Sequence, residues 1–358
     1  MSIPHPIRFS PDLESIQEDE QKTISGLNDQ FDIIMRTTSE DYGRAVRSVH
    51  AKAHGIIEGE LTIAADLPQE LKQGLFSVPA THKVYIRLST NAGDVLPDAI
   101  SLPRGFAMKV LDVTGPRLPG ADGSTQDFIM VNGPVFQAPN AAKFLSGLKL
   151  LAKTTDRMEG TKTVMSSVLQ TVNKGLEAVG VSSPTIQSLG GAPNVDPLGE
   201  TYFSVTPFRY GNYIAKFKLR PMSRDLTKRT GATINRRLGD DAIRETVRAE
   251  MQETKAVWEF QVQLCRDLEK QPIEDPTVEW SEEDAPFVTV ATVTAMQQDS
   301  WDEANVRKVD EEMRFSVWTG LDAHRPLGNI NRARREPYLH SAEFRRRFNG
   351  CPMHEPTQ

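Results

Sequence analysis

The sequence contains few of the residues that hold disulfide frameworks or clustered metal ions. Cysteine occurs only at Cys265 and Cys351 in 358 residues, and the seven histidines are mostly scattered. Two cysteines exclude a disulfide framework and suit a reducing compartment. The spacing of His50 and His54 would allow zinc binding on a helix, but the intervening Glu of the metalloprotease motif is missing. We therefore expect no zinc site made of clustered side chains.

Long apolar runs, targeting segments and an excess of basic charge are also missing. No run approaches the roughly 18 apolar residues of a membrane-spanning helix. The segment MSIPHPIRFSPDLESIQEDE has neither the apolar core of a signal peptide nor the acid-poor composition of a transit peptide. The net charge of −6 disfavours nucleic-acid binding as the main activity. We expect a cytoplasmic protein with no transmembrane segment and no nucleic-acid partner.

Three widespread motifs are absent as well. The chain has no GxGxxG, no Walker loop and no GxSxG, so dinucleotide, nucleoside triphosphate and serine-hydrolase functions lack their usual support.

A near-average content of Gly (24) and Pro (23) excludes collagen-like and broadly disordered classes. The length of 358 residues suits one large domain or about two ordinary domains, with room for a sizeable core.

Alternating apolar residues predict many strands. Val84, Ile86 and Leu88 alternate with Tyr85 and Arg87, which predicts a half-buried strand. Further strands are predicted near residues 106–110, 127–132, 213–217, 258–264 and 288–290. Because the strands have few helices between them, we expect an α+β fold built on an antiparallel barrel or sandwich.

Helical periodicity marks the parts of the chain outside these strands. Ser10 and Pro11 predict the start of an amphipathic helix over 11–38. Apolar stripes, first from Phe144 to Leu151 and then from Met165 to Val179, predict a helical insertion. The insertion covers about 140–200, and its last part, from 180, is loop-like because it is rich in Gly, Pro and Ser.

Two more helical features are predicted nearer the C-terminus. Asp240 is placed to cap a helix that carries Ile243, Val247 and Met251. The last 60 residues look helical and end in an Arg-rich stretch. Between 321 and 350 seven arginines face three acidic residues, which is typical of a solvated helix face or, alternatively, of a phosphate- or carboxylate-binding surface.

These patterns divide the chain into three expected parts. They are an N-terminal helical arm over 1–40, a strand-rich domain over 41–300 that carries the insertion, and C-terminal helices over 301–358.

Three separated segments carry a more specific pattern. They are RSVHAKAHG at 47–55, RLSTNAG at 87–93 followed by PRGFAMK at 103–109, and DFIMVNGPVF at 127–136. In order and spacing they resemble the haem catalase superfamily. Its members carry R-x-x-H-A with the distal histidine, an R-F-S-T-x-x-G strand, a P-R-G-F-A-x-K strand, and a distal Asn just before P-x-F.

The C-terminal part extends this resemblance. The superfamily has an Arg-x-x-x-Tyr helix with a further Arg seven residues after the Tyr, and here Arg334, Tyr338 and Arg345 have that spacing. The stretches HRPLGNINRARREPY and PIEDPTVEW are similar to the shorter catalase-related proteins. The resemblance spans about residues 40–348 and implies a β-barrel of the catalase type, in the compact branch that lacks a flavodoxin-like domain.

The resemblance implies haem b as the cofactor and gives individual residues a role. Tyr338 would ligate the iron as a phenolate, helped by Arg334 one helical turn earlier, because tyrosine ordinarily ionises only near pH 10. His50 would be the acid–base group, since imidazole is matched to neutral pH. Asn132 would donate a hydrogen bond to the peroxide.

The remaining implied residues bind the cofactor. Arg47, Arg87 and Arg345 would pair with the haem propionates, because guanidinium groups bind carboxylates bidentately. Val49 and Phe136 would belong to the haem pocket.

Each of these residues also has a purely structural interpretation. Taken alone, His50 would be a hydrogen-bonded structural histidine, Tyr338 a core aromatic, and Asn132–Gly133 a hairpin turn. Their joint occurrence in the superfamily's order favours function. Members of the superfamily often read G-N-N-T-P with the first Asn catalytic. Alignment on Pro134 places Val131 there, so a β-bulge would be needed to bring Asn132 into register.

The favoured function is therefore a haem-dependent, catalase-like peroxidase that reduces H2O2 or organic hydroperoxides, with an organic donor or a second peroxide as the electron source. One alternative is rearrangement of fatty-acid hydroperoxides, as in the allene oxide synthases of this superfamily. Those enzymes carry Thr before the distal histidine, whereas this chain has Val49. A haem-binding protein with little catalysis and a non-haem lipid carrier are further alternatives. The resemblance also suggests a homo-oligomer.

Overall fold

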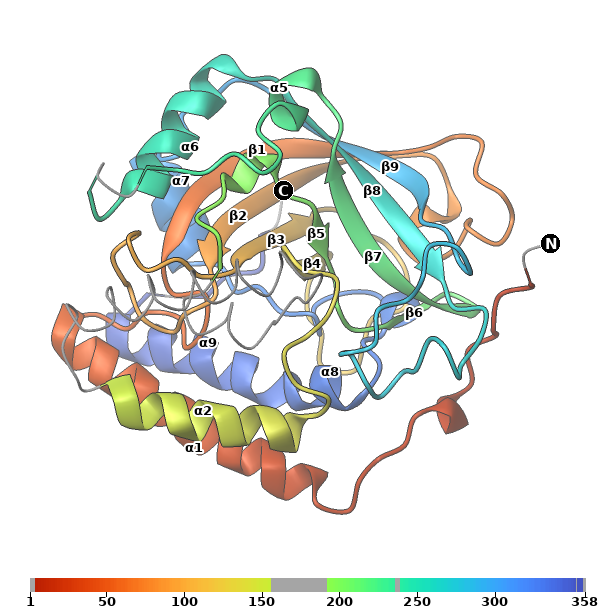
Figure 1. Ribbon diagram of the computed structural model, residues 1–358, viewed down its shortest axis with the longest axis horizontal. Coiled ribbons are helices and arrows are strands. Elements are labelled where there is room, and N and C mark those ends of the chain that lie inside the picture. The colour runs from red at the N-terminus through yellow and green to blue at the C-terminus, as the bar shows by residue number, and fades with distance from the viewer. Residues whose placement is uncertain (1–3, 156–191, 236–238, 352, 357–358) are drawn as a thin grey trace, which may run out of the picture.

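The computed structural model describes residues 4–155, 192–235, 239–351 and 353–356. Figure 1 shows a strongly curved sheet above a layer of helices. In the described residues the strands are β1 (Ala53–Ile63), β2 (Thr81–Thr90), β3 (Arg104–Val110), β4 (Gln126–Val131), β5 (Tyr202–Phe203), β6 (Phe208–Tyr210), β7 (Tyr213–Pro221), β8 (Ala256–Leu264) and β9 (Val288–Ala295). The α-helices are α1 (Glu20–Tyr42), α2 (Ala141–Thr155), α5 (Arg224–Thr227), α6 (Ala242–Glu253), α7 (Glu303–Asn305), α8 (Asn329–Ala333) and α9 (Arg335–Asn349).

The strands close into an antiparallel barrel. The sheet order is β5-β4-β3-β2-β1-β9-β8-β7-β6, and β5 also pairs with β7, so the ring closes and leaves β6 as a short hairpin arm. The predicted barrel and the strands predicted near 84–88, 106–110, 127–132, 213–217, 258–264 and 288–290 are confirmed.

Alternation along each strand separates two buried surfaces. Val84, Ile86 and Leu88 of β2 share one apolar cluster with residues of β7, β8 and β9 across the barrel, so they fill its interior. Tyr85 points outward and packs against Phe315 and its neighbours. The expectation that β2 is half-buried is therefore wrong from Val84 onward, because the C-terminal segment covers its outer face.

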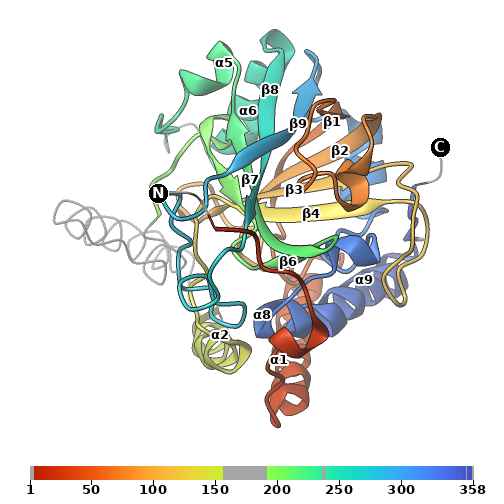
Figure 2. The same cartoon turned by 90° about the vertical axis from the view of Figure 1, so that its right-hand side faces the viewer.

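The helical layer lies against one side of the barrel (Figures 1 and 2). There α1, α2 and α8 meet in a second apolar cluster, which includes Phe31, Leu145, Leu148 and Ile330, and Phe344 of α9 packs against it. The predicted helix at the start of the insertion is confirmed as α2. The second predicted stripe, from Met165 to Val179, lies outside the described residues. No helix among the described residues is both long and apolar enough to cross a membrane.

Two helix starts differ from the prediction. Pro11–Leu13 form only a single 3₁₀ turn without a side-chain cap at Ser10, and the long helix begins at Glu20. The residues between them are not helical, and their polar groups bond elsewhere; Glu14, for example, has an extended backbone and accepts a hydrogen bond from Arg332.

The cap predicted for α6 also comes from elsewhere in the chain. Asp240 does not cap the helix, since Asp98 accepts the hydrogen bond of the Ile243 N–H (2.7 Å) from another part of the chain. The expected C-terminal helices are likewise interrupted: a π-helical segment, Val306–Glu311, is followed by turns before α8 begins at Asn329.

Candidate functional site

Two adjoining cavities lie between the outer face of the barrel and the helical layer. The smaller has about 600 Å³ of space between atoms and the larger about 1220 Å³, including space open to solvent. Val49, His50, Ile129 and Tyr338 line both. The chain segments that the sequence motifs singled out therefore converge on one place, although His50 and Tyr338 are far apart in the chain.

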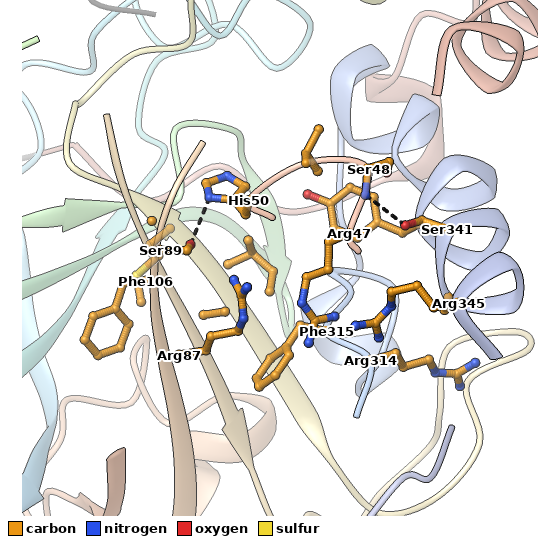
Figure 3. Close-up of a pocket in the computed structure, with 17 residues that line it drawn as sticks. Arg47, Ser48, His50, Arg87, Ser89, Phe106, Arg314, Phe315, Ser341 and Arg345 are labelled. Atoms are coloured by element: carbon orange, nitrogen blue, oxygen red, sulfur yellow. Dashed lines mark hydrogen bonds between the residues drawn. The ribbon is translucent and has the colours of Figure 1, made fainter. Parts of the chain in front are cut away.

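His50 is held in a defined place at the wall shared by the two cavities. Its backbone has a positive φ of 53°, its N–H donates to Asn91 O (3.2 Å), and its Nδ1 lies 3.0 Å from Ser89 Oγ (Figure 3). A Cβ at Gly105 would lie only 2.5 Å from His50 Nδ1, so this position on β3 must be glycine for the ring to lie there. Non-glycine residues with positive φ cost energy and are common at functional sites.

Electrostatics keep His50 uncharged. Burial, together with the positive charges of Arg87, Arg334 and Arg47, lowers the pKa of His50 to about 3. With Nδ1 bonded to Ser89, Nε2 is the ring nitrogen left for chemistry in the cavity.

Tyr338 lies on the first turns of α9. Arg334, the residue before this helix, donates from Nη2 to Tyr338 Oη (3.0 Å), and its guanidinium carbon lies 5.1 Å from the Tyr338 ring centre. Arg334 is itself held by Asn331 Oδ1 (3.2 Å). The predicted pairing of Arg334 with Tyr338 is present, and it places a positive charge directly on the phenol oxygen.

Three arginines surround one carboxylate at the smaller cavity, and we call Arg47, Arg87, Arg345 and Asp310 the arginine cluster. Arg87 Nε donates to Asp310 Oδ1 (2.7 Å), and Arg47 Nε lies 3.5 Å from the same oxygen. Arg47 and Arg345 also donate to the backbone carbonyl of Asp310 (2.8 and 2.9 Å). Figure 3 shows Arg47 and Arg345 next to each other beside Phe315.

The arginine cluster carries more positive charge than its own carboxylate balances. Burial alone would raise the pKa of Asp310, but Arg87 and Arg47 lower it to about 2, so Asp310 is charged. Three guanidinium groups and one carboxylate leave two positive charges in excess. Burial lowers the pKa of Arg47 and that of Arg345, the latter to about 10, and Nε of both is buried without a hydrogen-bond partner. Such a cluster is suited to an anionic group.

Asn132 lines the larger cavity, immediately after β4 ends. The ladder between β3 and β4 runs without a shift to the pair of Gly105 and Val131, so the bulge that would move Asn132 into register is absent. Val131 lines the cavity as well. The amide of Asn132 accepts from the Arg104 N–H (2.7 Å) and donates to Glu200 Oε2 (2.8 Å).

The apolar walls come from several elements. Val49 lines both cavities, and Phe136 lines the larger one, where its ring lies 5.4 Å from that of Phe144 on α2. All of the residues assigned from the sequence, apart from Arg47, Arg87 and Arg345, line the larger cavity, and those three line the smaller.

Sequence reasoning missed four residues of this site. Ser89 and Gly105 lie within the segments RLSTNAG and PRGFAMK that resemble the superfamily, but the sequence does not show that both lie against the His50 ring. Asp310 and Glu200 lie outside every motif, and nothing in the sequence marked them.

The positions of His50 and His54 do not form the helical pair that the zinc interpretation requires. His54 is on β1, completely buried and within hydrogen-bond distance of Thr90 Oγ1 (3.3 Å), so His50 and His54 are not on one helix. In the described part of the chain no group of three or more His, Cys, Asp or Glu side chains could hold a metal ion.

The Arg-rich stretch contains arginines that line the cavities and arginines that face solvent. Arg334 and Arg345 line the cavities, whereas Arg346 and Arg347 are exposed and pair with Glu343. The interpretation as a solvated helix face therefore holds for Arg346 and Arg347, whereas binding of a carboxylate or phosphate stays a prediction for the arginines that line the cavities.

The residues present fit a haem. Tyr338, whose oxygen accepts a hydrogen bond from Arg334, and His50 line both cavities, and apolar side chains line the larger one. The smaller cavity is lined by arginines with buried Nε atoms that have no hydrogen-bond partner. A macrocycle with carboxylates at one edge has this distribution of apolar and anionic surface.

Comparisons with known proteins concern the family and the fold. The catalase family profile matches residues 27–303, whereas a comparison with curated proteins finds no match. Similar solved structures include a fungal catalase (17% identity, TM-score 0.60), catalase A from Saccharomyces cerevisiae (14%, 0.57) and a bacterial catalase (16%, 0.59). They cover 89, 96 and 100% of this chain and 63, 67 and 67% of their own chains, respectively. This chain thus spans about two thirds of their length, and at these identities the likeness shows the fold.

Proposed function

The chain belongs to the catalase family, and on this premise we propose that it is a haem-dependent oxidoreductase that reduces hydrogen peroxide or organic hydroperoxides. The observation that carries the proposal is the convergence of His50 and Tyr338 on the same two cavities, beside an arginine cluster with two unbalanced positive charges.

The cofactor would be haem b, held at three places. Tyr338 would ligate the iron through Oη, and Arg334 would stabilise negative charge on that oxygen through its 3.0 Å hydrogen bond. The arginine cluster would bind the propionates, with the Arg47 guanidinium and the Arg345 Nε, which has no hydrogen-bond partner, as donors. Val49 and Phe136 would pack against the apolar part of the ring. When bound, haem supplies a ferric centre that exchanges electrons with a peroxide.

His50 moves the proton in this proposal. The low pKa of about 3 keeps the ring neutral at neutral pH, and in the tautomer whose Nδ1–H donates to Ser89 Oγ, Nε2 carries a free lone pair. Nε2 can therefore take the proton from one peroxide oxygen and return it to the other, which is general acid–base catalysis. Asn132 would orient the peroxide through an amide N–H.

An absorption spectrum of the purified protein tests the proposal directly. After expression with sufficient haem we expect a Soret band, and Tyr338→Phe should remove most of it. Tyr210→Phe is a matched control, because Tyr210 is also buried and hydrogen-bonded, to Leu71 O, but lies in the barrel interior. Absence of a Soret band from the wild-type protein would disprove haem binding.

The reaction is then identified with three substrates. Decomposition of H2O2 alone indicates catalase activity, consumption of H2O2 with a phenolic donor indicates peroxidase activity, and conversion of a fatty-acid hydroperoxide without a donor indicates rearrangement. Val49 before His50 favours the first two. The apolar wall that α1 and α2 contribute to the larger cavity gives the third enough support to be tested.

A further inference from the structure

The amide of Asn132 is fixed at both ends. Its backbone N–H donates to Arg104 O (3.1 Å), and its side-chain Oδ1 accepts from the N–H of the same residue (2.7 Å). Nδ2 donates to Glu200 Oε2 (2.8 Å). A backbone N–H can only donate and a carboxylate can only accept, so the amide cannot turn over without losing both bonds. One hydrogen on Nδ2 remains unused by these contacts.

Rigid local structure brings Glu200 to this amide. Val131 pairs with Phe203, so the antiparallel register places the residues after β4 beside those before β5. Glu200 directly follows the 3₁₀-helix Pro197–Gly199, where a Cβ on Gly199 would lie 2.4 Å from the backbone of Arg229. The Tyr202 hydroxyl also donates to Pro197 O (2.7 Å). The carboxylate is thus presented from a tightly packed turn.

The hydrogen bond from Asn132 favours the charged form of Glu200. Burial raises the pKa of Glu200, and the hydrogen bond from Asn132 and the charge of Arg104 oppose that effect, whereas nearby Asp196 adds to it. Asn132 supplies the side-chain hydrogen bond that the Glu200 carboxylate receives among the described residues. The bond therefore orders both partners.

We propose that Glu200 is a positioning residue for the peroxide reaction: it holds the Asn132 amide so that the second Nδ2–H faces the larger cavity as a hydrogen-bond donor. The inference rests on the proposed function, in which Asn132 contacts the peroxide. It explains how Asn132 serves this role from a position one residue beyond the family's register, because side-chain hydrogen bonds substitute for the missing bulge.

The test compares two substitutions of Glu200 in the haem-loaded protein. Glu200→Leu removes the acceptor at similar size, and we expect the rate with H2O2 to fall about tenfold, the effect of one hydrogen bond. Glu200→Gln keeps an acceptor oxygen and should stay within about threefold of the wild-type rate. Glu259→Leu is the matched control, because Glu259 pairs with Arg220 on the barrel surface away from the cavities, and it should leave the rate unchanged.

A double-mutant cycle separates positioning from a general structural effect. In an Asn132→Ala background, Glu200→Leu should cause no further loss, because Glu200 acts only through that amide. An equal loss with and without Asn132, or a wild-type rate for Glu200→Leu, overturns the inference.

A measurement without haem keeps the two proposals distinguishable. The side-chain ¹⁵N–¹H signals of Asn132 in the haem-free protein should shift in Glu200→Leu and not in Glu259→Leu. Unchanged signals refute the role of Glu200 even if the wild-type protein binds haem and reduces peroxide. Absence of a Soret band from the wild-type protein, by contrast, refutes the proposed function.

Discussion

The interior of the barrel and its outer face are built by the same strands and are opposite in character. Inside, aromatic rings pack at centroid distances such as 4.8 Å between Phe128 and Phe260. Outside, alternate residues of these strands, including Arg87 and Ser89, line cavities that hold charged and polar groups. A period of two along a strand thus assigns stability to one face and chemistry to the other.

His50 and His324 illustrate the difference between the outer face and the interior of the barrel. Burial lowers the pKa of both His50 and His324 to about 3. His324 lies among the interior rings and accepts a hydrogen bond from the Leu75 N–H through Nε2 (3.0 Å), so neither cavity contains it. A depressed pKa alone therefore does not mark a functional histidine; the cavity beside His50 does.

The largest expected effect is on the outer face. His50→Ala should slow peroxide cleavage about 10²- to 10⁴-fold, because the acid–base group is lost, while haem binding persists. Stopped-flow kinetics with H2O2 and the Soret absorbance per protein measure the two properties. A wild-type rate would remove His50 from the mechanism.

The corresponding change inside the barrel should affect stability instead. Phe128→Ala removes a fully buried ring from the aromatic cluster and should lower the free energy of unfolding by about 3–5 kcal/mol. Denaturant unfolding at neutral pH measures this loss. The comparison fails if Phe128→Ala leaves stability intact but abolishes the peroxide reaction in folded protein.

The free energy of unfolding should decrease in acid because His50 and His324 are buried in the uncharged form. Each is protonated in the unfolded chain below pH about 6.5 but in the folded protein only near pH 3, so stability is complete above 6.5 and is lost as pH falls toward 3. Each contributes up to about 1.4 kcal/mol per pH unit over that window. His50→Gln and His324→Gln should each flatten the dependence of unfolding free energy on pH between 7.5 and 5. An unchanged slope in either variant contradicts the assignment.

A smaller effect is expected for the arginine cluster. Asp310→Asn removes the carboxylate that pairs with Arg87 and Arg47 and should lower the stability of the haem-free protein by about 1–3 kcal/mol. If propionates bind the cluster, haem should restore part of this loss. Thermal unfolding with haem and with its dimethyl ester, which lacks the carboxylates, provides the test; equal rescue by both would argue against propionate binding here.

The smallest effect is expected at Gly105. An added methyl group would meet the His50 ring, so Gly105→Ala should reduce the peroxide rate about tenfold and change stability by less than about 1 kcal/mol. Gly147→Ala, on an open face of α2, is the control. A loss of unfolding free energy well above 1 kcal/mol together with an unchanged peroxide rate would show that Gly105 serves packing alone.

Much of the fold could be predicted because its signals are local. Alternation predicted β2, β3, β4, β7, β8 and β9 near their observed positions, and helical spacing predicted α2. Errors occurred where distant residues supply the partner. The cap of α6 comes from Asp98, and the non-helical segment that contains Glu14 is bound by Arg332.

The candidate site was predictable to a similar degree. His50, Tyr338, Arg334 and the three arginines of the arginine cluster follow from motifs whose order and spacing are visible in the chain. The positions of Asn132 and Val131 follow only from the register of β4, since a shift of one residue exchanges the two faces of a strand.

The sequence by itself determined the strand pattern, the family motifs and the residue types at the centre of the site, because periodicity and spacing are properties of neighbouring residues. Only the tertiary structure decided that Asp310 lies among three arginines, that Glu200 holds Asn132, and that Arg345 faces the cavity while Arg346 faces solvent. These contacts join segments tens to hundreds of residues apart, and closure of the barrel against the helical layer is what brings them within hydrogen-bond distance.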